Sequence, residues 1–296
     1  MLCESNNTKK NAIFPSNVDI FIGDLTDANL SLKKFIKDCD ILYHCAGEIN
    51  YEQRMSLLHI NGTKKLIQAV KNELKSTQKK LHWIQLSSCG AYGPPNNSDI
   101  QIKRTILETS ETNPANEYER TKTKSDEILM ASSSNNFEYT ILRPSNVIGS
   151  SMKNQSVHKL IKLVNSGYLF FIGKKDALCT YVHVDDVVKA LITISCNPNS
   201  RNEIFNISYD CSWEDLLKKI SYLLNVKMLP IRIPFELIQF PIKLIKLIFG
   251  KFFNIPQLDP LVFRTKYSTK KIESILNFKF SKPMPNAIED LIKQKK

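Results

Sequence analysis

The feature that most restricts the fold of this chain is a regular alternation of short apolar runs with helix-like stretches across its first half. We expect strands at 18–22, 40–45, 81–86 and 137–142, with helices at 30–37, 55–74 and 116–132 between them. Strands separated by helices with short connections form right-handed βαβ units and a parallel sheet. The sequence therefore predicts an α/β fold in which helices cover both faces of a parallel sheet.

Small and polar residues follow each expected strand. In sheets of this type the functional site lies beyond the carboxyl ends of the strands. The sequence therefore predicts one site built from four strand ends, namely Gly23-Asp24, Ala46-Gly47, Ser87-Ser88 and Arg143-Pro144.

The second half of the chain has longer loops, more proline and fewer alternating units. We expect a single unit over 1–296, with a core at 18–150 to which 181–208 returns as a strand end, a helix and a last short strand. The remaining parts, 151–180 and 209–296, are expected to form a small C-terminal substrate-binding region.

A tyrosine and a lysine four residues apart, Tyr118 and Lys122, fall in the expected helix 116–132. Residues i and i+4 share one helix face, so the ammonium group would lie near the phenol, favour the phenolate and let the tyrosine exchange protons near neutral pH. The spacing alone carries little weight, because Tyr267 and Lys271 repeat it. Only Tyr118 lies between a strand that ends in a Ser pair and one that ends in Arg-Pro. The alternative interpretation of either tyrosine is a surface residue on a lysine-rich helix.

Five motifs in order resemble the extended short-chain dehydrogenase/reductase family, in its NAD-dependent epimerase/dehydratase group. The resemblance runs from about Val18 to the C-terminus. The motifs are Gly23-Asp24-Leu25-Thr26-Asp27, Tyr43-His44-Cys45-Ala46-Gly47, Ser87-Ser88-Cys89-Gly90-Ala91-Tyr92-Gly93, Arg143-Pro144-Ser145-Asn146-Val147-Ile148-Gly149 and Tyr181-Val182-His183-Val184-Asp185-Asp186-Val187.

This resemblance implies a Rossmann-like fold and an NAD- or NADP-dependent epimerase or oxidoreductase. The substrate would be a sugar nucleotide or a similar small molecule, and the reaction would take place at one of its hydroxyl or keto carbons. The catalytic residues would be Ser88, Tyr118 and Lys122, with Tyr118 as the acid/base while a hydride moves to or from the nicotinamide. The cofactor-binding residues would be Asp24, Leu25, Cys45, Ala46, Gly47, His59, Ser87, Tyr118, Lys122, Pro144 and Ser145, and the substrate-binding residues Glu48 and Asn146.

The first departure from the family is at the N-terminus. The chain has only nine glycines, and no G-x-G-x-x-G turn or phosphate-binding loop is possible at their positions. The family's first two strands would also have to fit before Val18, where 17 residues stand. The fold is thus expected to be N-terminally truncated. The chain is either a shortened reading of a longer enzyme or a catalytically inactive relative that binds a ligand or a partner.

The second departure is His59, which stands where the family usually has an asparagine that supports the catalytic groups. His59 would either keep a hydrogen bond there or be a half-buried histidine with a structural role, and we favour the structural role.

The residues after Ser88 narrow the reaction. Family dehydratases have an Asp-Glu pair there, whereas this chain has Cys89-Gly90, so dehydration is disfavoured. We expect Cys89 to be a small core residue rather than a proton donor. Leu178-Cys179-Thr180 lacks the arginine with which many sugar-nucleotide members bind phosphate, which keeps a reductase of the hydroxysteroid or flavonol type open.

The net charge of +12 fits anionic partners such as a nucleotide, and an amphipathic segment at 235–253 suggests a substrate-domain helix or a membrane-surface contact. Scattered lysines without an aromatic–basic module disfavour nucleic acid binding.

Seven cysteines without a C-x-x-C pair indicate reduced thiols and no metal site. No apolar run is long enough to span a bilayer or act as a signal peptide. We expect a cytoplasmic protein that can form a homodimer.

Overall fold

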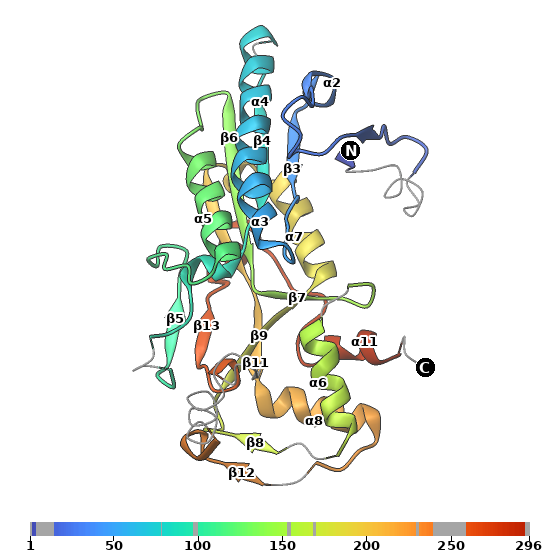
Figure 1. The fold of residues 1–296 in the computed structure, drawn as a ribbon, viewed down its shortest axis with the longest axis vertical. Coiled ribbons are helices and arrows are strands. Elements are labelled where there is room, and N and C mark those ends of the chain that lie inside the picture. Colours follow the sequence, from blue (N-terminus) through green and yellow to red (C-terminus); the bar gives the residue numbers. More distant parts are fainter. Residues whose placement is uncertain are drawn as a thin grey trace. The chain divides into compact units, whose positions relative to one another are not determined.

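A computed structural model describes residues 2–3, 15–77, 79–96, 100–152, 155–167, 170–228, 231–238 and 259–293 (Figure 1). The chain forms two compact units, each built from several segments. The first consists of 1–93, 111–143 and 191–205, and the second of 94–110, 144–190 and 206–296.

A four-stranded sheet forms the centre of the first unit, in the order β10-β6-β4-β3. Strand β4 runs parallel to both of its neighbours, with Trp83 opposite Leu42 on one side and Tyr139 on the other. The parallel sheet predicted from the alternation is confirmed. The strands are β3 (Ile41–His44), β4 (Leu81–Leu86), β6 (Phe137–Pro144) and β10 (Glu203–Ile207).

Helices α4 (Thr63–Thr77) and α5 (Glu117–Met130) supply the apolar side chains that cover the sheet. Leu66 and Val70 of α4 and Leu129 of α5 pack in one buried cluster with Trp83 and Phe137 of the strands. Burial of these side chains holds α4 and α5 against the sheet, and it fixes which residues of α5 can face the strand ends.

The expected helix 55–74 is divided in the structure. Helix α3 (Glu52–Met55) continues as a π-helix at Ser56–Gly62 and then as α4. The expected helix 30–37 is shorter and spans only α2 (Lys33–Ile36). A π-helical turn inserts an extra residue into the helix and turns its side chains, which periodicity does not reveal.

The polar leader contributes a strand that the sequence did not predict. Strand β1 (Leu2–Cys3) pairs in parallel with β2 (Phe21–Ile22), and this pair is a sheet of its own. The expected strand 18–22 is therefore reduced to its last two residues. Strand β3 is the end of the four-stranded sheet within the described part of the chain, and Ile41 and Tyr43 are 39% and 43% exposed there.

The second unit contains a three-stranded sheet in the order β11-β9-β7 and two pairs of short strands, β12 with β8 and β13 with β5. Ile161, Tyr181 and Ile220 belong to its buried apolar cluster. The strands are β5 (Arg104–Ile106), β7 (Asn146–Ile148), β8 (Phe171–Ile172), β9 (Leu178–His183), β11 (Tyr209–Ser212), β12 (Arg232–Ile233) and β13 (Thr265–Tyr267).

Four of the remaining helices that the structure describes lie in the second unit. The fifth, α7, starts in the second unit and ends in the first. These helices are α6 (Gln155–Asn165), α7 (Val184–Cys196), α8 (Trp213–Leu224), α10 (Lys270–Leu276) and α11 (Glu289–Lys293).

Candidate active site

The end of β4 and the start of α5 bring Ser88 and Tyr118 together. Ser88 precedes a 3₁₀ turn at Cys89–Tyr92, and its Oγ accepts a hydrogen bond of 3.0 Å from the Gly90 N–H. Asn116 caps α5 by accepting the Glu119 N–H at 2.9 Å. These two caps fix the backbone on both sides, and the side chains of Ser88 and Tyr118 form a hydrogen bond.

The protonation of Tyr118 differs from the sequence-based prediction. Burial raises the pKa of the Tyr118 phenol above its usual value, and the charges of Asp126 and Glu119 raise it further. The hydrogen bond with Ser88 acts in the opposite direction without reversing the shift. Lys122 is not among the groups that shift this pKa, so the free protein does not show the lowered pKa that the spacing predicts.

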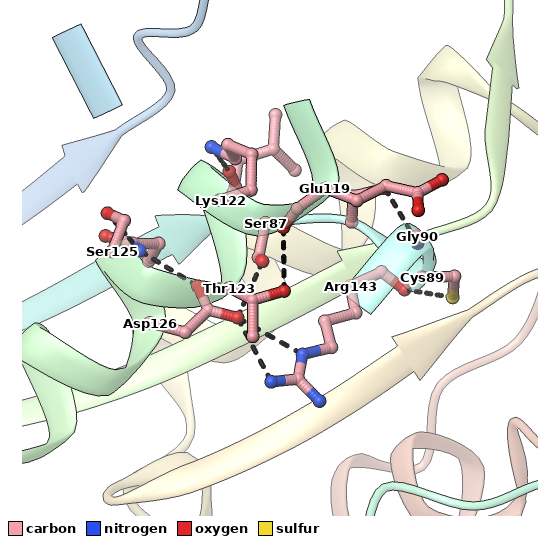
Figure 2. A network of polar contacts seen from close by, with 12 residues as sticks. Ser87, Cys89, Gly90, Glu119, Lys122, Thr123, Ser125, Asp126 and Arg143 are labelled. Carbon is pink, nitrogen blue, oxygen red and sulfur yellow. Dashed lines mark hydrogen bonds and ion pairs between the residues drawn. The ribbon is translucent and has the colours of Figure 1, made fainter. Parts of the chain in front are cut away.

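Lys122 lies one helical turn after Tyr118 and is only 6% exposed. Its Nζ donates a hydrogen bond of 2.6 Å to the Leu86 carbonyl at the end of β4 (Figure 2). Burial lowers the pKa of Lys122, whereas the nearby Asp126 and Cys45 act to raise it. An ammonium group has three donors, so the described contacts leave donor capacity on a buried cation.

His59 is buried in the π-helix and connects the end of β3 to helix α5. Its Nε2 accepts the Glu48 backbone N–H at 2.8 Å, which leaves the proton of a neutral ring on Nδ1, 2.8 Å from Thr121 Oγ1. Burial lowers the pKa of His59 to about 4, and the charge of Lys122 contributes. The ring also packs edge-on against Tyr118, with centroids 5.6 Å apart. His59 thus has hydrogen bonds to both segments that carry candidate site residues.

Cys45, Ala46, Gly47 and Glu48 follow β3, as the motif predicts. Cys45 is exposed and interacts electrostatically with Lys122. The Glu48 carboxylate accepts the backbone N–H groups of Asn50 at 2.7 Å and Tyr51 at 3.2 Å, and these bonds hold its pKa below the usual value.

Asp24 and Leu25 follow β2. Oδ1 of Asp24 accepts the Thr26 N–H at 2.8 Å, and Oδ2 lies 3.2 Å from Arg54 Nη2. Burial acts to raise the pKa of Asp24, but these interactions lower it overall. Leu25 is buried in the apolar cluster of the first unit.

A buried carboxylate, Asp126, was missed by the sequence analysis. Its Oδ2 accepts the Ser87 hydroxyl at 2.7 Å and two Arg143 nitrogens, Nε at 3.2 Å and Nη2 at 3.1 Å, and Oδ1 accepts Gln85 Nε2 at 3.0 Å (Figure 2). Asp126 stands four residues after Lys122, so the helix period that singled out Lys122 also puts Asp126 on that face. The network fixes the turn that carries Ser88, since Ser87 precedes it directly.

Cys89 is buried, and its Sγ lies 3.1 Å from the Arg143 carbonyl oxygen. A thiol committed to a backbone carbonyl agrees with the interpretation as a small core residue.

Three predicted residues, Pro144, Ser145 and Asn146, belong to the second unit. The Ser145 N–H donates to the Ile207 carbonyl at 3.0 Å, and its Oγ lies 2.8 Å from Ser208 Oγ. Asn146 is exposed in β7, and its side chain donates to the Thr180 carbonyl at 3.1 Å. Pro144 is the last residue of β6.

The second tyrosine–lysine pair is not on one helix. Tyr267 ends strand β13, and Lys271 lies in α10. This agrees with the expectation that only Tyr118 has the surroundings of a site.

Most of the amphipathic segment 235–253 lies outside the described residues. Among the helices that the structure describes, none combines the length and apolar character that crossing a bilayer requires. The described residues also contain no group of three or more His, Cys, Asp or Glu that could hold a metal ion.

The sequence profile of the NAD dependent epimerase/dehydratase family matches residues 2–208. The chain belongs to this family. The match includes every residue proposed for the candidate site. A search of curated protein sequences finds no match.

Solved structures with the same fold include members that act on nucleotide sugars. UDP-glucuronic acid 4-epimerase from Bacillus cereus, in complex with NAD, is 18% identical with a TM-score of 0.68, covering 93% of this chain and 81% of its own. UDP-glucose 4-epimerase from Thermotoga maritima, with UDP-glucose, is 18% identical with a TM-score of 0.68, covering 95% and 86%. RMD from Pseudomonas aeruginosa, complexed with NADPH, is 15% identical with a TM-score of 0.65, covering 97% and 92%. At these identities the likeness shows the Rossmann-like fold.

The family name implies an NAD or NADP cofactor, and Lys122 has the chemistry to hold its hydroxyl groups, because its buried ammonium keeps N–H donors that the Leu86 carbonyl does not take. For the diphosphate, the chain has no glycine-rich turn of the kind that usually presents backbone N–H groups at a helix N-terminus.

Proposed function

We propose that this family member is an NAD- or NADP-dependent epimerase or oxidoreductase that acts on a hydroxyl or keto carbon of a sugar nucleotide or a similar small molecule. The observation that carries the proposal is the side-chain hydrogen bond between Ser88 and Tyr118, with the buried Lys122 one turn after Tyr118 on helix α5. A hydrogen-bonded hydroxyl pair suits proton exchange with a substrate alcohol.

Each of the three residues has a separate role in this proposal. Tyr118 exchanges the proton of the substrate hydroxyl, and Ser88 donates a hydrogen bond that stabilises the phenolate form of Tyr118. Lys122 binds the nicotinamide ribose with the donors that Leu86 leaves free. When bound, the cofactor accepts or returns the hydride at the reacting carbon.

The remaining candidate residues bind either the cofactor or the substrate in this proposal. Glu48 and Asn146 bind the substrate. The cofactor-binding residues are Asp24, Leu25, Cys45, Ala46, Gly47, His59, Ser87, Pro144 and Ser145. His59 would act as a positioning residue, because both of its nitrogens already have partners in the protein.

Dehydration is the family reaction that the site supports least. The positions after Ser88 hold Cys89 and Gly90, and the Cys89 thiol lies against the Arg143 carbonyl. Neither of these two positions therefore supplies the carboxylate acid or base that elimination would need.

A direct test uses nicotinamide fluorescence and a panel of nucleotide sugars and of hydroxysteroid or flavonol ketones. We expect binding of NADH or NADPH in the micromolar range, turnover of one substrate class, and loss of turnover by at least about 100-fold in Tyr118→Phe with binding retained. Lys122→Met should weaken cofactor binding, whereas Lys124→Met, on the exposed side of the same helix, should leave it unchanged.

The second candidate function is a catalytically inactive family member that binds a ligand or a partner. Its supporting observation is the composition of the chain, in which nine glycines form no phosphate-binding turn, together with the end position of β3 among the strands that the structure describes. Absence of binding at millimolar NAD and NADP in a folded preparation would favour this function over the enzyme.

For partners and location we propose a cytoplasmic protein without nucleic acid ligands. Self-association to a homodimer and membrane-surface contact through 235–253 are the further interactions that the composition suggests. Light scattering and liposome flotation, with and without residues 235–253, test these two points.

A further inference from the structure

Two cysteines of the second unit lie directly opposite each other on neighbouring strands. Cys179 of β9 pairs with Cys211 of β11 in an antiparallel ladder that runs from Tyr209 opposite Tyr181 to Ser212 opposite Leu178. Their sulfur atoms are 3.3 Å apart, and Cys179 Sγ also lies 3.2 Å from the Cys211 carbonyl oxygen. Opposite residues of an antiparallel pair have Cα atoms about 4.5–5.5 Å apart, within the range that a disulfide spans.

The surroundings of the pair hold the two strands in register. The Trp213 N–H donates to the Ala177 carbonyl at 3.1 Å, which continues the ladder by one pair beyond Leu178. Tyr181 and Trp213 pack edge to face with centroids 6.3 Å apart. The two sulfur atoms therefore meet without rearrangement of the backbone.

The two thiols differ in access. Cys179 is 2% exposed, whereas Cys211 is half-buried. The hydrogen bond with Cys211 and burial both raise the pKa of Cys179, which disfavours its thiolate as the first group to react. A small oxidant therefore reaches Cys211 first.

We propose that Cys179 and Cys211 are a redox modification site that forms a reversible cross-strand disulfide with hydrogen peroxide as the oxidant. The Cys211 sulfur attacks the peroxide, the O–O bond breaks, and a sulfenic acid and one water form. The Cys179 sulfur then attacks the Cys211 sulfur, the S–S bond forms, and the departing hydroxide takes the Cys179 proton to give a second water. Two thiols lose two electrons, and one peroxide gains them.

The position of the site gives the bond a structural effect. The chain leaves the second unit after Ala190, contributes 191–205 to the first, and returns at Asn206. A Cys179–Cys211 bond would close a loop that contains this whole excursion, so both of its ends would be fixed in the second unit. Thiols remain reduced in the cytosol under ordinary conditions, and the bond would form transiently.

The test is peptide mapping of the reduced, full-length protein after graded hydrogen peroxide and alkylation in denaturant. We expect a linked Cys179–Cys211 peptide that dithiothreitol releases. Cys211→Ser should abolish it and leave Cys179 fully alkylated. The matched control is Cys196→Ser, which removes an exposed cysteine elsewhere and should leave the linked peptide unchanged.

A second arm repeats the oxidation in urea, so that the result does not depend on how the variants fold. A preference for the Cys179–Cys211 link in the folded protein, lost in urea, supports the proposal. Recovery of both residues as free thiols at a peroxide dose that oxidises Cys196 would overturn it, as would equal linkage of Cys179 to any other cysteine.

Discussion

The backbone N–H of Glu48 donates a hydrogen bond of 2.8 Å to Nε2 of His59, and this bond fixes the tautomer of a buried imidazole. The ring must be neutral to accept it, so protonation of His59 breaks the connection between the β3 loop and the π-helix. The Nδ1 proton then faces Thr121 Oγ1, 2.8 Å away on helix α5.

The first prediction concerns the acid stability of the first unit. The pKa of His59 is lowered to about 4 in the folded protein, so between that value and the normal 6.5 the unfolded chain binds more protons. Stability therefore falls as the pH drops through this window, by up to about 3 kcal/mol for this group. His59→Gln should reduce this loss. Urea unfolding followed by Trp83 fluorescence in a Trp213→Phe background measures it.

An unchanged pH slope in His59→Gln would show that the imidazole is not held neutral. His44 and His82, whose pKa values burial lowers to about 3, contribute with the same sign and should preserve part of the slope.

The second prediction concerns Tyr118. Burial and the charges of Asp126 and Glu119 raise the pKa of its phenol, so we expect it to stay protonated beyond the usual range in the free protein. Ser88→Ala should raise this pKa further, whereas Glu119→Gln should lower it. Ultraviolet difference titration of each protein against its Tyr118→Phe counterpart isolates the signal. Shifts in the same direction for both variants would contradict this assignment.

The third prediction concerns the ion pair between Asp126 and Arg143, in which both side chains are buried. Removal of one partner leaves the other charge buried and unpaired, so Asp126→Asn should destabilise the first unit by about 3–5 kcal/mol. The control is Glu127→Gln on the same helix, which breaks an exposed pair with Lys124 and should cost less than about 1 kcal/mol. Equal effects would show that Asp126 is not the centre of the network.

The fourth prediction concerns Asp210 in the second unit. Burial raises its pKa to about 6, although Ser208 and the Tyr267 N–H act to lower it. The folded state thus binds a proton that the unfolded state has lost, so stability falls as the pH rises from about 4 to about 6, by roughly 2 kcal/mol for this half-buried group.

Asp210→Asn imitates the protonated side chain, so it should remove this fall and make the second unit more stable than the parent at neutral pH. Trp213 fluorescence in a Trp83→Phe background reports the unfolding of both proteins. A variant that is less stable at neutral pH would contradict the raised pKa.

The strongly periodic elements could be predicted from the sequence. Strand β4 has the expected bounds, and α5 begins directly after Asn116, where the expected helix begins, because apolar alternation and a side-chain cap are local signals. The π-helix around His59 could not be predicted, because its register depends on the hydrogen bonds of His59 to distant segments.

The residues of the candidate site could be proposed from the sequence, but their electrostatics could not. Motif order singled out Ser88, Tyr118 and Lys122, and spacing suggested that Lys122 would lower the pKa of Tyr118. Spacing carries no information about burial or about Asp126, whose hydrogen bonds to Ser87 and Arg143 require strands β4 and β6 to be adjacent.

The interleaved path of the chain has a consequence for its synthesis. Strand β10 pairs with β6 at one end of the first unit's sheet, yet it leaves the ribosome some sixty residues after β6. Until then β6 has an unprotected edge, and pairing over such a separation is slow and prone to aggregation. A nascent chain interrupted before Glu203 would therefore need a chaperone, whereas one that has passed Ile207 can complete this sheet.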